Sequence, residues 1–151
     1  MKKVAIDTNI VVSAALSPTG NPAAIMNMVY DGKLQTCYSL EIIAEYSKVL
    51  AYPRLNIASH TQTGIVDAII GAGTLIRPIV STVPLPHEND RVFYDTAQTG
   101  GAVLITGNAK HYPNEPFIMS PVEFLERSQL LTKREEEQHI VVPPTDIGIM
   151  K

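Results

Sequence analysis

The chain has 151 residues, a formal net charge of −3 and one cysteine, and 45% of its residues are hydrophobic. This length and apolar content are typical of one folded domain and exclude a disordered chain. The acidic balance argues against a protein that holds nucleic acid by bulk positive charge. The single cysteine excludes an intramolecular disulfide and a Cys-rich zinc site, so we expect Cys37 to be a small core residue.

Nothing in the sequence indicates a membrane protein. No stretch reaches the roughly 20 apolar residues that a membrane span needs. Asp7 and Asn9 interrupt the apolar region that a signal peptide would need after the basic start. We therefore expect a cytoplasmic protein that makes no membrane contact.

In the first half of the chain, apolar runs alternate with helical patterns, which is typical of a mainly parallel sheet with crossover helices. The pattern predicts strands over residues 3–7 and 34–38 and helices over 23–30 and 60–71. Another helix is predicted from Ser39, a natural N-cap, until Pro53 stops it. One apolar stripe defines the buried face of that helix: Ile42, Ile43, Tyr46, Val49 and Leu50.

The second half continues the alternation. Residues 74–80 predict a strand or an extended edge, since Pro78 suits an edge position. Residues 90–99 predict a helix, and residues 102–108 and 116–120 predict strands. A last helix is predicted from Pro121 to about Leu130. The fold class is therefore predicted to be α/β.

The domain is predicted to span residues 1–131. The remaining residues, 132–151, are predicted to form a C-terminal tail in which "KREEE" is a solvated charged face. The apolar part of this tail, residues 140–142, indicates docking or contact with a partner.

The apolar run "VAIDTNIVVSAAL" carries an aspartate and an asparagine in its middle. An ionised Asp7 at the end of a buried strand is costly to desolvate unless something pairs with it. Asn108 ends the strand over 102–108, and the carboxyl ends of parallel strands meet at one edge of a sheet. We therefore expect Asp7 and Asn108 on one rim. The alternative for Asp7 is an N-cap of a helix beginning near Ile10.

Two further acids, Glu45 and Asp90, are candidates for the same rim. Glu45 flanks the apolar stripe of its helix, and its alternative is an exposed side chain paired with Lys48. Asp90 opens the helix that leads into the strand over 102–108, or it serves only as the N-cap of that helix. Asp95 lies five residues later and points away from Asp90, as a surface residue would.

Taken together, these acids indicate a cation. Several carboxylates gathered in one cleft repel one another and raise one another's pKa values. A hard divalent cation relieves this repulsion. Oxygen ligands around a small octahedral ion favour Mg²⁺ or Mn²⁺.

Three segments, in this order and spacing, resemble the PIN-domain family of metal-dependent ribonucleases. "AIDTNIVVSAAL" resembles its opening strand with an Asp-Thr-Asn motif, and "SLEIIAEYSKVL" resembles the helix with the second acid, at Glu45. "NDRVFYDTAQTGGAVLITGN" resembles the block with the third acid, at Asp90, and a strand ending in Thr-x-Asp. The resemblance spans about residues 3–125. "TGNAKHYP" is similar to the branch that comprises toxins of toxin–antitoxin modules.

The resemblance implies a three-layer αβα sandwich with a mainly parallel central sheet, and it implies hydrolysis of RNA. In the site that the resemblance implies, Asp7, Glu45 and Asp90 hold Mg²⁺ or Mn²⁺, Asn108 supports them, and Asp95 is an outer metal ligand. It also implies an RNA substrate, a cognate antitoxin protein and a homodimer or higher homo-oligomer. Asn108 stands where many family members have a fourth acid; its carbonyl oxygen reaches a cation or its water but contributes no charge.

Neighbouring polar residues are candidates for supporting roles. Asn9 is expected to orient Asp7 or a water, with a turn amide as its alternative. Thr106 and Thr8 are hydroxyls expected near the rim, where they either support the site or are merely structural. The candidate substrate contacts, with ordinary solvated surface as the alternative, are Arg91, Lys110 and His111.

Two other enzyme classes also begin with a strand that ends in aspartate. A haloacid-dehalogenase-like phosphotransferase needs a second acid two residues on, where this chain has Asn9. A receiver-type signalling domain needs an acidic pair beside the aspartate, and none precedes Asp7. One alternative stays open: with Asn108 in place of an acid, the domain could bind RNA or a partner without cutting.

Overall fold

A parallel sheet of five strands forms the centre of the molecule, in the order β3-β2-β1-β4-β5. This computed structural model describes the backbone of residues 1–141 and their side chains except 132, 135 and 138–141. All four strand pairings are parallel. The strands are β1 (Lys2–Ile6), β2 (Leu34–Tyr38), β3 (Gly73–Leu75), β4 (Val103–Ile105) and β5 (Ile118–Met119).

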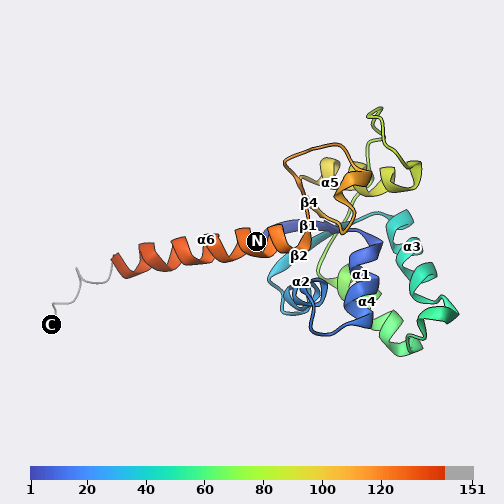
Figure 1. Cartoon of the computed structure of the whole chain (residues 1–151), viewed down its shortest axis with the longest axis horizontal. Helices are drawn as coiled ribbons and strands as arrows, with labels where there is room; N and C mark the ends of the chain where they lie inside the picture. Colours follow the sequence, from blue (N-terminus) through green and yellow to red (C-terminus); the bar gives the residue numbers. More distant parts are fainter. Residues whose placement is uncertain (142–151) are drawn as a thin grey trace.

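Helices cover both faces of this sheet. They are α1 (Thr8–Leu16), α2 (Asn21–Tyr30), α3 (Leu40–Leu50), α4 (Ser59–Gly71), α5 (Arg91–Gly100) and α6 (Pro121–Val141), with short 3₁₀ turns η1 (Pro53–Leu55), η2 (Glu88–Asp90) and η3 (Ala109–His111). In Figure 1, α5 lies above the sheet, against β1, β2 and β4, whereas α1, α2 and α4 lie below it. The predicted α/β three-layer architecture is confirmed.

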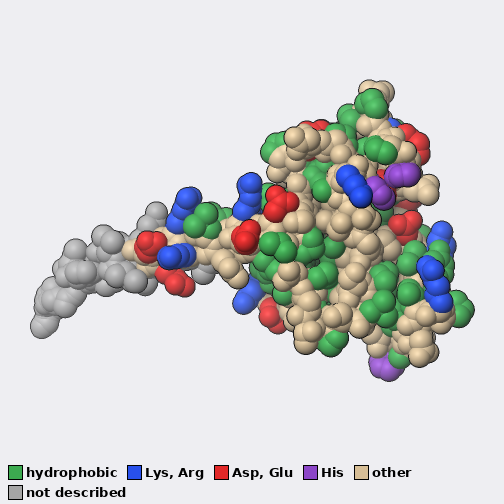
Figure 2. Space-filling view, viewed as in Figure 1, with side chains coloured by type: hydrophobic (Ala, Val, Ile, Leu, Met, Phe, Trp, Pro, Cys, Tyr) green, Lys and Arg blue, Asp and Glu red, His purple; other side chains and the backbone are tan. Residues whose placement is uncertain are grey.

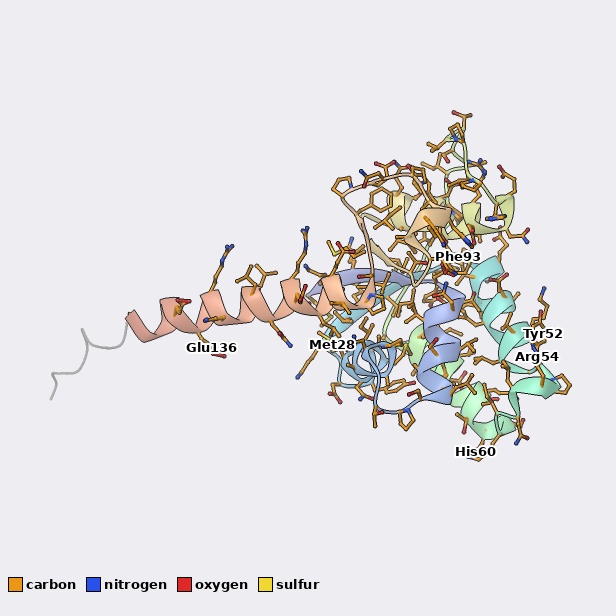
Figure 3. All side chains as sticks on the ribbon, in the orientation of Figure 1. Met28, Tyr52, Arg54, His60, Phe93 and Glu136 are labelled. Atoms are coloured by element: carbon orange, nitrogen blue, oxygen red, sulfur yellow. The ribbon has the colours of Figure 1, made fainter. Side chains whose placement is uncertain are left out.

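The core lies where the central strand meets the helices. Val4, Ala5 and Ile6 of β1 are buried on both faces, as a central parallel strand requires. The Tyr46 ring of α3 packs against the Phe93 ring of α5, with centroids 6.4 Å apart, and the Tyr46 hydroxyl donates a hydrogen bond to the Ile6 carbonyl. Phe93 lies at this junction in Figure 3. The end of β1 is therefore fixed by both helices.

Several local predictions hold. The Ser39 hydroxyl caps α3 by accepting a hydrogen bond from the Ile42 N–H at 3.2 Å. Cys37 is a buried free thiol, as expected of a small core residue. No helix in the described part of the chain is long and apolar enough to cross a membrane.

The segment after β3 differs from the prediction. The strand ends at Leu75 instead of continuing toward Val80. The Ile76 N–H still donates to the Tyr38 carbonyl of β2, but further along the backbone bonds to side chains of α5: the Ile79 N–H donates to Thr99 Oγ1 and the Ser81 N–H donates to Asp95 Oδ2. Because Pro78 lacks an N–H, it suits this non-ladder path.

The last helix is longer than predicted. Instead of ending near Leu130, α6 continues to Val141, because no glycine or proline interrupts the sequence before Pro143. Its first turns pack on the body through the fully buried Phe124, and the remainder projects away from it (Figure 1). The docking predicted for residues 140–142 concerns side chains that lie outside the described residues.

Candidate active site at the carboxyl edge of the sheet

The site lies at the carboxyl ends of β1 and β4. These strands pair in parallel with Ile6 opposite Ile105, and the Asp7 N–H continues the ladder to the Ile105 carbonyl at 3.0 Å. Asp7 follows one strand, and Thr106 and Asn108 follow the other. The sequence prediction of a shared rim is confirmed by this register.

The Asp7 carboxylate is buried, with only 6% of the residue exposed. Its Oδ2 accepts hydrogen bonds from the Thr106 hydroxyl at 2.8 Å and from the Tyr112 hydroxyl at 3.0 Å. Although Asp7 precedes α1, which begins at Thr8 rather than near Ile10, its side chain makes no capping hydrogen bond. The alternative of a simple helix cap is therefore wrong.

The environment of Asp7 disfavours its charge. Burial raises the pKa of this carboxyl, while the hydrogen bonds from Thr106 and Tyr112 offset part of that rise, and the nearby Asp90 raises it further. Burial, with the Asp7 charge next, also raises the pKa of the Tyr112 phenol far above its usual range. Tyr112 therefore remains a hydrogen-bond donor to Asp7 at any physiological pH.

Glu45 reaches the site from α3. Ile42, Tyr46 and Leu50 face the core, which leaves Glu45 half-buried at the flank of the helix. Its Oε2 accepts a hydrogen bond from the Thr8 hydroxyl at 2.7 Å, and Thr8 is the neighbour of Asp7 in the chain. Among the described residues the ion pairs are Arg91–Glu88 and His111–Asp90, so the alternative pairing of Glu45 with Lys48 is not formed.

Asp90 reaches the site from the loop that leads into α5. It precedes the helix but makes no side-chain capping hydrogen bond. Its Oδ2 lies 3.4 Å from His111 Nδ1 and is buried without a hydrogen-bond partner, so the contact is electrostatic. Burial raises the pKa of Asp90, while His111 and His87 lower it and Glu45 raises it. The two imidazole rings lie with their centroids 4.6 Å apart.

The three acids form one electrostatic cluster. Asp90 raises the pKa of Asp7, Glu45 raises that of Asp90, and both Asp7 and Glu45 raise that of the buried Tyr46 phenol, after burial itself. Among the side chains that the structure describes, however, no three His, Cys, Asp or Glu are arranged to hold one metal ion. The donor chemistry still fits a hard divalent cation: the atoms are carboxylate oxygens that repel one another, and one is buried without a partner.

The two asparagines make structural contacts. Asn9 Oδ1 accepts a hydrogen bond from the Gly107 N–H at 3.0 Å and so ties α1 to the loop after β4; no contact with Asp7 is involved. The Asn108 N–H donates to Thr106 Oγ1 at 3.0 Å, and Thr106 in turn donates to Asp7. The Asn108 backbone thereby orients the hydroxyl that holds the first acid.

Asp95 and Arg91 lie in a different environment from the one predicted. Asp95 is only 2% exposed, so it is not a surface residue, and it accepts a hydrogen bond from the Ser81 N–H at 3.2 Å. The Arg91 guanidinium donates to the Ser81 and Val83 carbonyls and pairs with Glu88. Both side chains hold the segment that leads to Asp90. Arg91 is therefore not a free phosphate contact, and the structure does not group Asp95 with the three acids.

The remaining candidate residues, and two residues that the sequence did not predict, lie in two loops. Lys110 is exposed on η3, and the adjacent His111 contacts Asp90 rather than solvent alone. Sequence reasoning missed Tyr112 and His87. No periodicity marks a side chain in an irregular loop; the only signal was the position of Tyr112 close behind Asn108.

Asp7→Asn is expected to raise the melting temperature of the metal-free protein at pH 7 by about 2–4 °C, the shift that roughly 1 kcal/mol produces in a chain of this size. The amide oxygen still accepts hydrogen bonds, while the buried charge is removed. Because folding raises the pKa of Asp7, its ionisation costs stability as the pH rises from the ordinary value of 3.8 through the folded value. Calorimetry in chelator should therefore show the gain at pH 7 and none below pH 3.8.

The matched control is Asp67→Asn on the exposed face of α4, which should leave the melting temperature unchanged. A lower melting temperature for Asp7→Asn at pH 7 would contradict the burial of an uncompensated charge.

Comparison with known proteins identifies the family of this chain. The family model described as the PIN domain matches residues 3–110, which is most of the chain. The chain is also 28% identical over 109 residues to an uncharacterized protein of Methanocaldococcus jannaschii, and the match covers 70% of each chain. The region that the family model matches contains Asp7, Glu45 and Asp90. The chain therefore belongs to the PIN-domain family.

Proposed function

We propose that this chain is a divalent-metal-dependent endoribonuclease that hydrolyses RNA phosphodiester bonds. PIN domains are in general nucleases, and they typically use divalent metal ions. The observation that carries the proposal is the clustering of three acids from three separate segments. Burial and the neighbouring acids raise the pKa values of Asp7 and Asp90, and a bound cation would relieve the repulsion between the carboxylates. A purely structural role gives no reason to gather like charges there.

In this proposal Asp7, Glu45 and Asp90 hold Mg²⁺ or Mn²⁺, and the Asn108 carbonyl oxygen supports them. When bound, such an ion lowers the pKa of a bound water and shields the charge of the attacked phosphate. Thr106 and Tyr112 fix the Asp7 carboxylate in one orientation, and Thr8 does the same for Glu45. Asp95 acts from a distance, by anchoring the segment that carries Asp90.

We expect the purified protein to cut a single-stranded RNA with blocked ends in Mg²⁺ or Mn²⁺ and to lose this activity in chelator. Asp7→Asn, Glu45→Gln and Asp90→Asn should each lower kcat at least about 100-fold, the loss typical when one electrostatic stabiliser of a transition state is removed. Gel analysis of end-labelled fragments gives the rate.

Glu41→Gln is the matched control, because Glu41 lies one turn before Glu45 on α3 and is exposed. It should cut at the wild-type rate. A preparation that cuts no RNA with either metal, or equal losses for Glu41→Gln and Glu45→Gln, would contradict the proposal.

The competing function is a domain that binds RNA or a partner without cutting, because Asn108 supplies no fourth charge. Asn108→Asp separates the two. A fourth carboxylate should increase Mn²⁺ affinity about tenfold, which corresponds to roughly 1.4 kcal/mol. Titration of the melting temperature with Mn²⁺ measures it. Cleavage by Asn108→Asp but not by the wild type would favour a wild-type domain that binds without cutting. An unchanged Mn²⁺ affinity would exclude Asn108 from the metal site.

The finer proposal is that the enzyme is the toxin of a toxin–antitoxin module. It rests on the resemblance of "TGNAKHYP" to that branch and on the RNA-directed chemistry above. Expression of the chain alone should then arrest growth, and Asp90→Ala should relieve the arrest whereas Asp67→Ala should not. Normal growth at high expression of soluble wild-type protein would contradict this role.

A further inference from the structure

We propose that the outer face of α3 and the η1 turn after it form a binding track for the RNA strand beyond the cleavage site. The track consists of Lys48, Tyr52 and Arg54. This inference rests on the proposed function, because it identifies the ligand as single-stranded RNA. It adds a surface that lies apart from the acid cluster.

The helix period places the start of the track beside the candidate catalytic acid. Lys48 follows Glu45 by three residues within α3, so both lie on one face of the helix, and Tyr52 follows two residues after the helix ends at Leu50. At about 1.5 Å of rise per residue, Lys48 lies about 4.5 Å along the helix axis from Glu45. The opposite face, with Ile42, Tyr46 and Leu50, is buried in the core, which fixes this one outward.

The Arg54 guanidinium lies over the aromatic ring of Tyr52. It lies 5.3 Å from the centroid of that ring, and the residue is exposed on η1. Figure 3 shows Tyr52 and Arg54 side by side at the outer edge of the molecule, beyond the end of α3. A stacked guanidinium of this kind offers a planar surface to a base and donors to a phosphate.

The cations of this track are not neutralised by the protein. In the part of the chain that the structure describes, the ion pairs involve Arg91 and His111, and neither Lys48 nor Arg54 pairs with a carboxylate. Figure 2 shows Lys and Arg side chains along this edge, below the pair of histidines. In a chain of net charge −3, unpaired cations beside an aromatic ring favour a local anionic ligand.

The chemistry favours single-stranded RNA over an acidic peptide. Proteins that follow single strands combine cations for the backbone with aromatic side chains on which bases stack. The track has both, in the part of the chain that follows Glu45. Lys110 is exposed on η3 next to His111, which contacts Asp90, and would add a phosphate contact near the acid cluster.

The first experiment measures binding without cleavage. Fluorescence anisotropy with an RNA of roughly 12 nucleotides, within the range of single-strand sites, is recorded in chelator at several salt concentrations. The double variant Lys48→Gln/Arg54→Gln should bind about tenfold more weakly, and the salt slope should fall by about 1.4, because each phosphate contact to a single strand contributes roughly 0.7. The control Lys133→Gln/Arg134→Gln, with the same charge change on the projecting part of α6, should bind as the wild type does.

The second experiment tests the aromatic ring. Tyr52→Ala should weaken binding about tenfold, within the range expected for loss of one base stack, whereas Tyr52→Phe should bind like the wild type. If the Arg54–Tyr52 contact only stabilised the turn, Tyr52→Ala would lower the melting temperature and leave RNA affinity unchanged. That result, or equal losses in the track and control variants, would overturn the inference.

Failure of this inference is distinguishable from failure of the proposed function. Wild-type binding that depends on the track, without any cleavage, would retain the track and remove the nuclease. Cleavage of the same RNA with unchanged KM in the double variant would retain the nuclease and remove the track. Track-dependent binding of an acidic peptide but not of RNA would overturn the choice of ligand.

Discussion

The burial of one carboxylate at the end of the central strand is the constraint on which this structure depends. Asp7 continues the β1 ladder, so its position is fixed by the register of β1 against β4. Its side chain enters a region where charge is costly, and two hydroxyls compensate only part of that cost. A protein that keeps such a group loses stability there, which is the pattern expected of a functional site.

The rest of the site is arranged around this carboxylate by elements of different rigidity. Glu45 sits on a helix packed into the core, and Thr8 connects it to the start of α1. Asp90 instead sits at the end of a loop. Three residues spaced by four along α5 hold the segment before it: Arg91, Asp95 and Thr99. Hydrogen bonds from α5 therefore hold this segment in place and position Asp90 near the other two acids.

The parts of this arrangement that follow a period were predictable from the sequence. Alternating strands and helices predicted a parallel sheet, and hence that Asp7 and Asn108 share its edge. The apolar stripe of α3 placed Glu45 at the flank of the helix. The resemblance supplied the role of Asp90, which periodicity alone left as a helix cap.

The parts that depend on irregular backbone were not predictable. Tyr112 contacts Asp7 only because η3 turns the chain back over the rim, and no local pattern encodes that turn. Asp95 was predicted to point away from Asp90, which is consistent with the structure, but its burial depends on a distant segment, residues 79–83, that packs beside α5. The predicted α6 was too short. The charged stretch "KREEE" consists of good helix formers, so it continues the helix, although the same composition is also typical of a solvated tail.

The central claim is that Asp7, Glu45 and Asp90 share one divalent ion. A crystal soaked in Mn²⁺ and measured for anomalous scattering tests it most directly. The account predicts one strong anomalous peak in contact with oxygens of all three side chains. A peak elsewhere, or none at saturating Mn²⁺, would contradict it.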